Sequence, residues 1–336
     1  MNENKQKVKA VGLMSGGLDS TLAARLVKEC DVEVYGLFCS MPWGCGNEGK
    51  ARASAREVGI PLEITHPDEE FMRMLKNPRY GYGSALNPCV DCHTYMIRKA
   101  ELFRQKIDAH FVFTGEVLGQ RPMSQTRNSL QKVDKHCGIP GYLLRPLCAL
   151  NLEPTRPEQD GLIDRDKLLD ITGRSRRRQY ALAEKWGLKA FMQPAGGCLL
   201  TDQNFANRMR DLFEYGYRHL NDTICLQWGR HFRLRPSFKA ITGRDEPENL
   251  NLQEYADPDD IIMLFENDQP GPLVILQGAR PPQDILDLAG GLIQIFSKFK
   301  SDPPLPVLYW TKNNALNKTV FTPPKLTEKK ALTFKI

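Results

Sequence analysis

Residues 15 to 20 read Ser-Gly-Gly-Leu-Asp-Ser, which places two glycines, two hydroxyls and one carboxylate within six positions. Glycines let the backbone approach a ligand closely, and the free amides at the start of a helix attract anions. The carboxylate of Asp19 is suited to hold a magnesium ion that neutralises phosphate charge. The stretch therefore predicts a phosphate-binding loop, with a simple capped turn as the alternative.

Three cysteines form a second group of residues that could bind a metal or take part in a reaction. Cys89 and Cys92 stand in a Cys-x-x-Cys sequence before a predicted helix, and Cys198 follows two glycines. A lone Cys-x-x-Cys is typical of zinc or redox sites alike. Three thiolates without a clear fourth ligand favour an iron–sulfur cluster with one open iron, since structural zinc usually has four protein ligands. His93 fits poorly as a fourth ligand, and Cys45 is a reserve. The remaining cysteines are expected to be structural: Cys30, Cys39, Cys137, Cys148 and Cys225.

The elements around these residues alternate between strand-like and helix-like patterns. A strand over residues 9–14 leads into the loop, and apolar residues at helical spacing follow it. Further strand-like segments cover residues 32–39, 62–66, 109–117 and 142–150. This alternation predicts a parallel sheet wrapped by helices, in which ligands bind at the carboxyl ends of the strands. The loop, the end of 32–39 and residues 114–120 should then face one cleft.

A second glycine-rich segment, from Gly44 to Lys50, matches the first seven positions of a Walker A loop. The eighth position requires Ser or Thr for magnesium, and this chain has Ala51 there. We therefore expect a surface loop that leads into a helix.

Composition limits the classes of protein. The 336 residues are 41% hydrophobic, enough for two ordinary domains, and no apolar run reaches the length of a membrane span. No secretory signal is visible at the N-terminus, so the nine cysteines argue for reduced thiols or metal ligands and for the cytoplasm. The net charge of +6 is compatible with nucleic acid, and four arginines gather in one short run: Arg174, Arg176, Arg177 and Arg178.

The sequence changes character after about Tyr217. Aromatic and β-prone residues with turn signals are followed by a strand-like segment at 271–277, an amphipathic helix and a last strand-like segment ending at Trp310. We predict a first domain over residues 1–217, a smaller α+β domain over 218–312, and a loosely held tail over 313–336.

The motifs resemble those of a known group of enzymes. The string from Ser15 to Ser20 resembles the PP-loop of the ATP-pyrophosphatases, and with the three cysteines it is similar to the tRNA thiolation enzymes of that group. The strings "TGEVLGQRPMSQTRNSL" and "LLRPL" resemble segments of the 4-thiouridine synthetase family, and the 2-thiouridylases share the loop. The RNA-binding THUMP domain and the rhodanese domain of that family are missing. Residues 218–312 instead resemble the RNA-binding domain of NFACT proteins, through "ITGRDEPENLNLQEYADPDDII".

The resemblance implies an α/β fold with a parallel-sheet PP-loop domain, of the HUP or adenine nucleotide α-hydrolase type, and a smaller C-terminal α+β domain. It implies a tRNA-uridine sulfurtransferase: AMP is transferred to a uracil carbonyl oxygen, and sulfur then displaces AMP. ATP, Mg²⁺ and an iron–sulfur cluster, expected as [4Fe–4S], would be the cofactors. The partners would be tRNA and a sulfide or persulfide donor, with no membrane, and we also consider a homodimer.

The implied residues fall into four groups. Asp19, Cys89 and Cys198 would be catalytic. Asp19 would hold magnesium, and Cys89, Cys92 and Cys198 the cluster. ATP would be bound by Ser15, Gly16, Gly17, Leu18, Asp19, Ser20, Gly36, Leu37, Phe38, Gly115, Gln120, Ser124 and Gln125. RNA would be bound by Arg174, Arg176, Arg177, Arg178, Arg230, Arg233 and Arg235. Trp228 and Phe232 lie in the same segment as the last three cations, as suits stacked bases.

Three alternatives remain. The same reaction could use a persulfide on Cys198, resolved by Cys89 or Cys92, without a cluster. A PP-loop ligase or amidotransferase would activate a carboxylate instead, although no glutaminase-like segment is present. A non-enzymatic RNA-binding protein would have a degenerate loop, whereas Ser15 to Ser20 is intact.

Overall fold

A computed structural model describes residues 7–44, 46–192, 197–217, 219–267 and 269–336. The chain divides into two compact units, residues 1–201 and residues 202–336. This boundary lies earlier in the chain than the expected one at residue 217, because α8 (Gln203–Tyr215) belongs to the second unit.

The first unit is built on a five-stranded parallel sheet in the order β3-β2-β1-β4-β5. Its strands are β1 (Lys9–Leu13), β2 (Glu33–Cys39), β3 (Leu62–Thr65), β4 (Phe111–Phe113) and β5 (Leu143–Leu144). The chain progresses outward from β1 to β3 and then returns to the other side of β1 with β4. The strand order therefore reverses between β1 and β4, which is where ligands bind in open parallel sheets.

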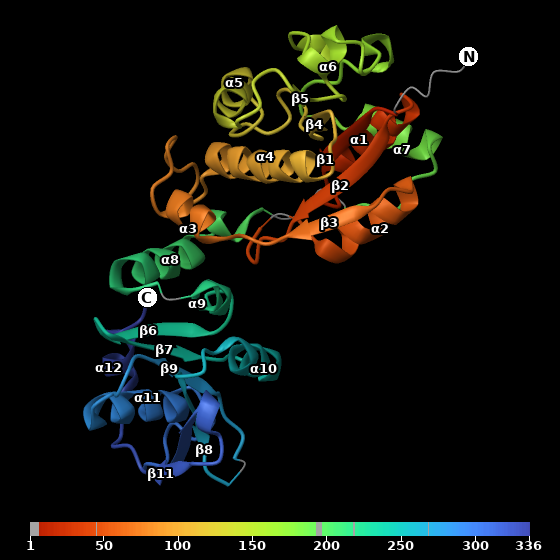
Figure 1. Cartoon of the computed structure of the whole chain (residues 1–336). Coiled ribbons are helices and arrows are strands. Elements are labelled where there is room, and N and C mark those ends of the chain that lie inside the picture. The colour runs from red at the N-terminus through yellow and green to blue at the C-terminus, as the bar shows by residue number, and fades with distance from the viewer. Residues whose placement is uncertain (1–6, 45, 193–196, 218, 268) are drawn as a thin grey trace. The chain divides into compact units, whose positions relative to one another are not determined.

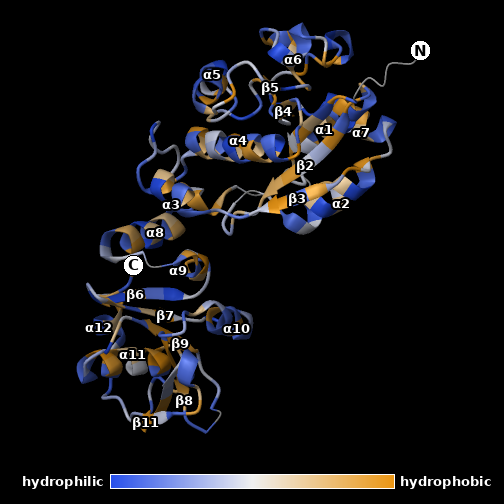
Figure 2. Cartoon of the chain, viewed as in Figure 1, coloured by the Kyte–Doolittle hydropathy of each residue, from blue (hydrophilic) through white to orange (hydrophobic). Residues whose placement is uncertain are grey.

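Alternating side chains of each strand feed two separate cores. Ala10, Val34 and Phe111 point to the face covered by α1 (Leu18–Glu29), α2 (Glu48–Val58) and α7 (Arg177–Lys185). Val11 and Val112 point to the opposite face, which is covered by α4 (Cys89–Lys106) and α5 (Arg127–His136). Figure 1 shows these helices on the two sides of the sheet, and Figure 2 shows the apolar residues concentrated between the layers. Two shorter helices, α3 (Glu69–Lys76) and α6 (Arg156–Gln159), complete the unit.

The helices begin where side chains can satisfy their first amides. Asn47 accepts a hydrogen bond from the amide of Lys50 at the start of α2, and Asp68 caps α3 in the same way. The expectation of a loop leading into a helix after Gly44 is met by this cap. By contrast, α1 has Gly17 at its N-cap position and no side-chain cap. Its first amides are therefore available to another acceptor.

The second unit contains a six-stranded antiparallel sheet in the order β11-β10-β8-β9-β7-β6. Its strands are β6 (Arg230–Arg235), β7 (Phe238–Thr242), β8 (Ile261–Phe265), β9 (Val274–Gln277), β10 (Val307–Thr311) and β11 (Thr319–Phe321). One face packs on α11 (Gln283–Ile295) and α12 (Glu328–Leu332), and the other on α9 (Leu220–Cys225) and α10 (Glu246–Tyr255). The predicted combination of a parallel α/β domain with a smaller α+β domain is confirmed.

The expected tail over residues 313–336 is instead part of the second unit. β11 pairs with β10, and Ala331 of α12 is fully buried in the core with Leu326 and Phe334 beside it. The last residues run along β6, where the amide of Arg233 donates to the Phe334 carbonyl (2.8 Å) and the amide of Ile336 to the His231 carbonyl (3.0 Å). The prediction of a tail was wrong because the segment is rich in charged residues and only a few apolar residues attach it to the core.

None of the helices in the described part of the chain combines the length and the hydropathy that crossing a bilayer requires.

Candidate active site

The loop between β1 and α1 is held by its own hydroxyl groups. The Ser15 amide donates to Ser20 Oγ (3.2 Å), and Ser20 Oγ donates to the Gly17 carbonyl (3.0 Å). Thr21 Oγ1 donates to the same carbonyl (2.9 Å). These bonds fix the loop from within and leave Ser15 exposed at its tip.

Two helix N-termini meet at this loop. Gly16 has a φ of 75°, and a Cβ there would lie 2.6 Å from the amide nitrogen of Ala51 in the first turn of α2. A Cβ on Gly115 would lie 2.6 Å from the amide nitrogen of Ser20, at the start of α1. Only glycine fits at either position, and the positive ends of both helix dipoles face the loop. The arrangement suits a polyanion such as a triphosphate.

A chain of amide side chains reaches the carboxylate of Asp19. Gln120 Nε2 donates to Asp19 Oδ2 (2.5 Å), and Gln179 Nε2 donates to Gln120 Oε1 (2.7 Å). Because a carboxylate only accepts, Gln120 must turn its NH₂ toward Asp19, and this fixes the direction of the whole chain. Within the described residues, Asp19 Oδ1 and Gln179 Oε1 are buried and have no hydrogen-bond partner.

The unpartnered acceptors show that the site fits a cation. Burial raises the pKa of Asp19, and the nearby Arg176, 3.6 Å from Oδ2, partly opposes this rise. A buried carboxylate oxygen that lacks a donor is costly, and a magnesium ion would satisfy it. Asp19 Oδ1 would hold the ion, while the rest of its shell would come from phosphate oxygens and water.

The other expected cleft residues divide into two sets. Gly115 and Gln120 lie directly against the loop, as described. Ser124 and Gln125 are buried, and Gln125 Oε1 is a further buried acceptor without a partner among the described residues. The amide of Gly119 donates to the Gln125 carbonyl (2.7 Å), so these residues form one compact turn after β4.

Gly36, Leu37 and Phe38 lie inside β2 and are buried. A Cβ on Gly36 would lie 2.8 Å from Leu62 Cδ1, and a Cβ on Gly46 would lie 2.6 Å from the Phe38 ring. These side chains support the sheet at this strand. Their role in binding ATP stays a prediction.

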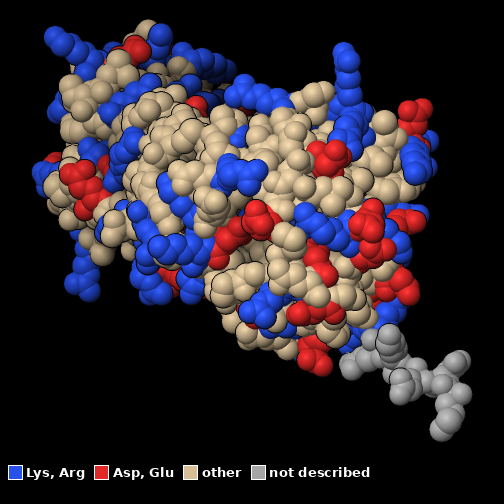
Figure 3. Space-filling view, turned by 90° about the horizontal axis from the view of Figure 1, so that it is seen from above, with Lys and Arg blue, Asp and Glu red and all other residues tan. Residues whose placement is uncertain are grey.

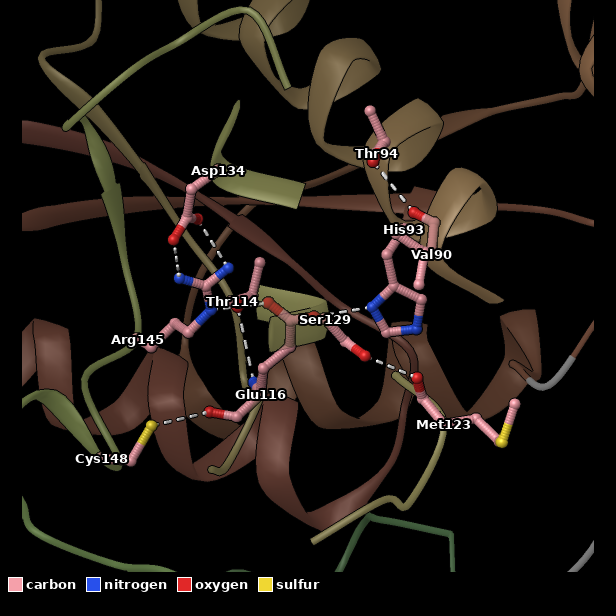
Figure 4. Close-up of polar contacts among 10 residues, drawn as sticks. All are labelled: Val90, His93, Thr94, Thr114, Glu116, Met123, Ser129, Asp134, Arg145 and Cys148. Atoms are coloured by element: carbon pink, nitrogen blue, oxygen red, sulfur yellow. Dashed lines mark hydrogen bonds and ion pairs between the residues drawn. The ribbon is translucent and has the colours of Figure 1, made fainter. Parts of the chain in front are cut away.

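A buried ionic network joins the end of β4 to the helix that carries the Cys-x-x-Cys sequence. Glu116 accepts hydrogen bonds from Arg145 Nε (2.9 Å) and Thr114 Oγ1 (3.0 Å), and its Oε1 lies 2.7 Å from His93 Nδ1 (Figure 4). Arg145 also holds Asp134 (2.8 Å). Burial alone would raise the pKa of Glu116, but Arg145 and His93 lower it to about 2. His93 therefore anchors α4 to the end of β4.

The three candidate cysteines lie on neighbouring segments. Cys89 and Cys92 are half-buried in the first turn of α4, where Cys89 Sγ lies 3.0 Å from Asn87 Oδ1. Cys198 is half-buried, with Sγ 3.4 Å from the Trp43 carbonyl. The amide of Leu86 donates to the Leu200 carbonyl (3.0 Å), so the segment before Cys89 and the segment after Cys198 are bonded to each other.

The described residues do not form a ready metal site around these thiols. No group of three Cys, His, Asp or Glu side chains in the part of the chain that the structure describes is arranged to hold a metal ion. An iron–sulfur cluster on these thiols therefore stays a prediction, and no reaction step is derived through one. Cys45, the reserve ligand, lies outside the described residues.

The cysteines expected to be structural differ from this trio. Cys39, Cys137, Cys148 and Cys225 are buried, and burial raises the pKa of each thiol, to about 12 for Cys39. Cys30 is half-buried at the end of α1, and burial raises its pKa too. A raised pKa disfavours the reactive thiolate.

The arginine run at the start of α7 has two environments. Arg174, Arg177 and Arg178 are exposed, and Arg178 donates to Asp170 (2.6 Å) at the surface. Arg176 is turned toward Asp19 instead. RNA binding by the three exposed arginines stays a prediction.

The cations of β6 are mostly paired within the second unit. Arg233 binds Asp211 of α8 through two hydrogen bonds (2.7 and 3.0 Å), Arg235 pairs with Asp284, and Arg230 lies over the ring of Phe296 (4.8 Å). Phe232 is buried in the core. Figure 3 shows one face of the molecule, seen from above, on which acidic side chains lie among the basic ones. Arg235 is the most exposed of the three arginines, so its predicted RNA contact is the one most accessible.

Sequence reasoning missed Gln179, Glu116 and Arg145 as site residues. Glu116 and Arg145 stand in the quoted strings "TGEVLGQ" and "LLRPL". The strings marked these segments, but they did not indicate that the two side chains form a buried ion pair. Gln179 gave no signal, because its contact with Gln120 spans 59 positions of sequence.

Comparison with known proteins agrees with the resemblance of both units. Residues 6–154 match the family described as thiamine biosynthesis protein (ThiI), and residues 229–332 match the NFACT protein RNA binding domain. The chain is 35% identical over 114 residues to the tRNA-specific 2-thiouridylase MnmA of Sulfurimonas denitrificans, covering 31% of this chain and 33% of that protein. It is 27% identical over 255 residues to MnmA of Geotalea uraniireducens, covering 68% and 64%.

The chain thus spans between about a third and two thirds of the length of these curated relatives. Among solved structures, a 4-thiouridine synthetase–RNA complex with bound ATP aligns at a TM-score of 0.40 and 20% identity, covering 57% of this chain and 44% of that chain.

Proposed function

We propose that this chain is an ATP-dependent tRNA sulfurtransferase, which adenylates a uridine carbonyl and replaces its oxygen by sulfur. One observation carries the proposal: the uncapped N-terminus of α1 lies beside Asp19, whose Oδ1 is a buried acceptor without a partner in the described residues. A site with free amides and a free carboxylate oxygen suits a magnesium–triphosphate. Support for the sulfur chemistry comes from the match of residues 6–154 and from the 2-thiouridylase relatives.

In the first step, the uracil carbonyl oxygen attacks the α-phosphorus of ATP, and pyrophosphate leaves. The amide of Leu18 and the hydroxyl of Ser15, which accepts from the Gly17 amide (3.3 Å), would stabilise the charge on the leaving group. Magnesium, when bound, neutralises further charge on the pyrophosphate. Gln120 and Gln179 keep the Asp19 carboxylate oriented.

In the second step, sulfur attacks the carbon that carries the adenylated oxygen, and AMP leaves with both electrons of the broken C–O bond. Sulfide as the nucleophile gives the thiocarbonyl directly, after loss of its proton. A persulfide on Cys198 would first form a C–S–S–Cys198 bond, and the thiolate of Cys89 or Cys92 would then attack Cys198 and release the thiolated base, leaving a disulfide. An iron–sulfur cluster on Cys89, Cys92 and Cys198, of the [4Fe–4S] type, is the other carrier that we propose to test.

The second unit is proposed to hold the tRNA, on the strength of its match to an RNA binding domain. The exposed arginines Arg174, Arg177 and Arg178 in the first unit would add phosphate contacts. Reduced thiols and a tRNA substrate suit the cytoplasm, and assembly as a homodimer stays a prediction.

The test is nucleoside mass spectrometry of tRNA from cells with and without the gene, joined to an assay of purified protein with ATP and tRNA. We expect one thionucleoside to disappear with the gene, and pyrophosphate release to depend on tRNA. A PP-loop amidotransferase would instead release pyrophosphate with a carboxylate substrate and release AMP with ammonia, and the thionucleosides would be unchanged.

A further inference from the structure

The arginine run at the start of α7 contains one residue that faces the loop. Arg176 occupies the N-cap position of α7, and Gln179 in the first turn of the same helix reaches Gln120. The end of this segment is also fastened to the loop, since the Met192 amide donates to the Gly16 carbonyl (2.7 Å). Residues 176–192 therefore begin and end beside the loop.

Arg176 is held loosely at that place. Its Nη2 lies 3.6 Å from Asp19 Oδ2, too far for a good hydrogen bond, and Oδ2 is already bonded to Gln120 at 2.5 Å. Among the residues that the structure describes, the Arg176 guanidinium has no other hydrogen bond or ion pair. Its side chain is only 20% exposed. A guanidinium carries five N–H groups, so most of its donors are available while most of its surface is shielded from solvent.

The three neighbouring arginines differ from it. Arg174, Arg177 and Arg178 are exposed, and Arg178 is satisfied by Asp170. A cation that is partly buried beside the amides of a phosphate loop is suited to the planar, two-pronged binding of a phosphate group. A cation on the exposed side of α7 is suited to a nucleic-acid backbone.

We propose that Arg176 binds a phosphate of the nucleotide at the Ser15–Ser20 loop, and so leaves the RNA-binding set in which the sequence placed it. In the free protein Arg176 balances the charge of Asp19. With a magnesium–triphosphate present, the ion would neutralise the charge of Asp19 instead, and the guanidinium would turn its N–H donors to the phosphates. This inference rests on the proposed function, because it requires ATP at the loop.

The experiment compares full-length wild type with Arg176→Ala, Arg176→Lys, Arg178→Ala and Arg52→Ala by calorimetric titration with MgATP, without tRNA. Arg52 is an exposed arginine of α2 bonded to Glu48 and serves as a neutral control. Hydrogen bonds to charged groups contribute about 1.5–3 kcal/mol, which corresponds to roughly a 10- to 150-fold loss of affinity. We expect a loss in that range for Arg176→Ala, a smaller one for Arg176→Lys, and changes under about twofold for the other two.

A second measurement separates nucleotide binding from RNA binding. The affinity for one tRNA is measured across a salt series for the same variants, and thermal unfolding checks that each is folded. We expect Arg176→Ala to keep the wild-type tRNA affinity and salt slope, and Arg178→Ala to reduce both. Unchanged MgATP affinity in folded Arg176→Ala overturns the inference, as does a loss confined to tRNA affinity. If the wild type itself does not bind MgATP, the proposed function fails as well.

Discussion

Glu116 Oε1 lies 2.7 Å from His93 Nδ1, and this contact fastens the end of β4 to the helix that carries Cys89 and Cys92. It joins the phosphate-loop side of the sheet to the cysteine side within one buried network, which Arg145 completes. A change in the network should therefore affect the stability of the first unit.

We expect Glu116→Gln to lower the free energy of unfolding by about 3 kcal/mol at neutral pH, because Arg145 loses a charged partner in a buried site. The pKa of Glu116 in the folded protein is about 2, below its ordinary value of 4.5. The ionised carboxylate therefore contributes fully to the free energy of unfolding above pH 4.5, and this contribution is lost as the pH falls toward 2. The variant should thus show a weaker dependence of stability on pH in that window. Denaturant unfolding across pH values measures both effects.

The matched control for this prediction is Glu70→Gln, which breaks a surface pair with Arg98 (2.8 Å). Exposed pairs contribute about 1 kcal/mol or less. Equal losses in the two variants would show that the Glu116 network does not stabilise the unit.

Asp19→Asn should keep the fold and abolish tRNA-dependent pyrophosphate release. The amide can still accept from Gln120, but it lacks the negative charge that a magnesium ion requires, and we expect a loss of at least about 100-fold in turnover. Pyrophosphate release at saturating tRNA is the measurement. Asp170→Asn, at the exposed pair with Arg178, is the control and should stay close to wild type. Near-normal turnover in Asp19→Asn would rule out its role.

The cysteine trio predicts iron in protein that is purified or reconstituted without oxygen. Alanine at Cys89, Cys92 or Cys198 should lower the content of iron and acid-labile sulfide, while alanine at Cys30 should not, because Cys30 lies at the end of α1 on another segment. Metal analysis and the visible absorbance test this. Wild-type protein that contains zinc or no metal, yet thiolates tRNA, would favour the persulfide on Cys198.

The arginines of β6 should differ in role: one should contact RNA, and another should stabilise the second unit. Arg235→Ala removes an exposed cation and should weaken tRNA binding modestly, with a salt slope smaller by about 1 and little change in stability. Arg233→Ala should mainly destabilise the second unit, because among the described residues Asp211 would keep Lys239 alone as an ionic partner (3.2 Å). Filter binding across a salt series and thermal unfolding distinguish the two. A drop in tRNA affinity in stable Arg233→Ala would contradict this division.

The loop and the first sheet could be predicted because their signals are local. The strand at 9–13, the glycines and the helix from Leu18 follow one another within twenty residues. The partners of the cations could not be predicted, since Asp211 and Asp284 lie 22 and 49 positions from Arg233 and Arg235. Helix α10 was missed because it buries only Glu248 and Leu252, although Asp245 caps it at the Glu248 amide (3.0 Å).

The final residues of the described chain have a consequence for self-association. β6 stands at the margin of its sheet, and residues 334–336 run along its open side through the bonds to Arg233 and His231. An uncovered strand margin is a template for another chain, from which intermolecular sheets and aggregates grow. This short stretch therefore covers the backbone groups of an edge strand that would otherwise be open to pairing with another chain.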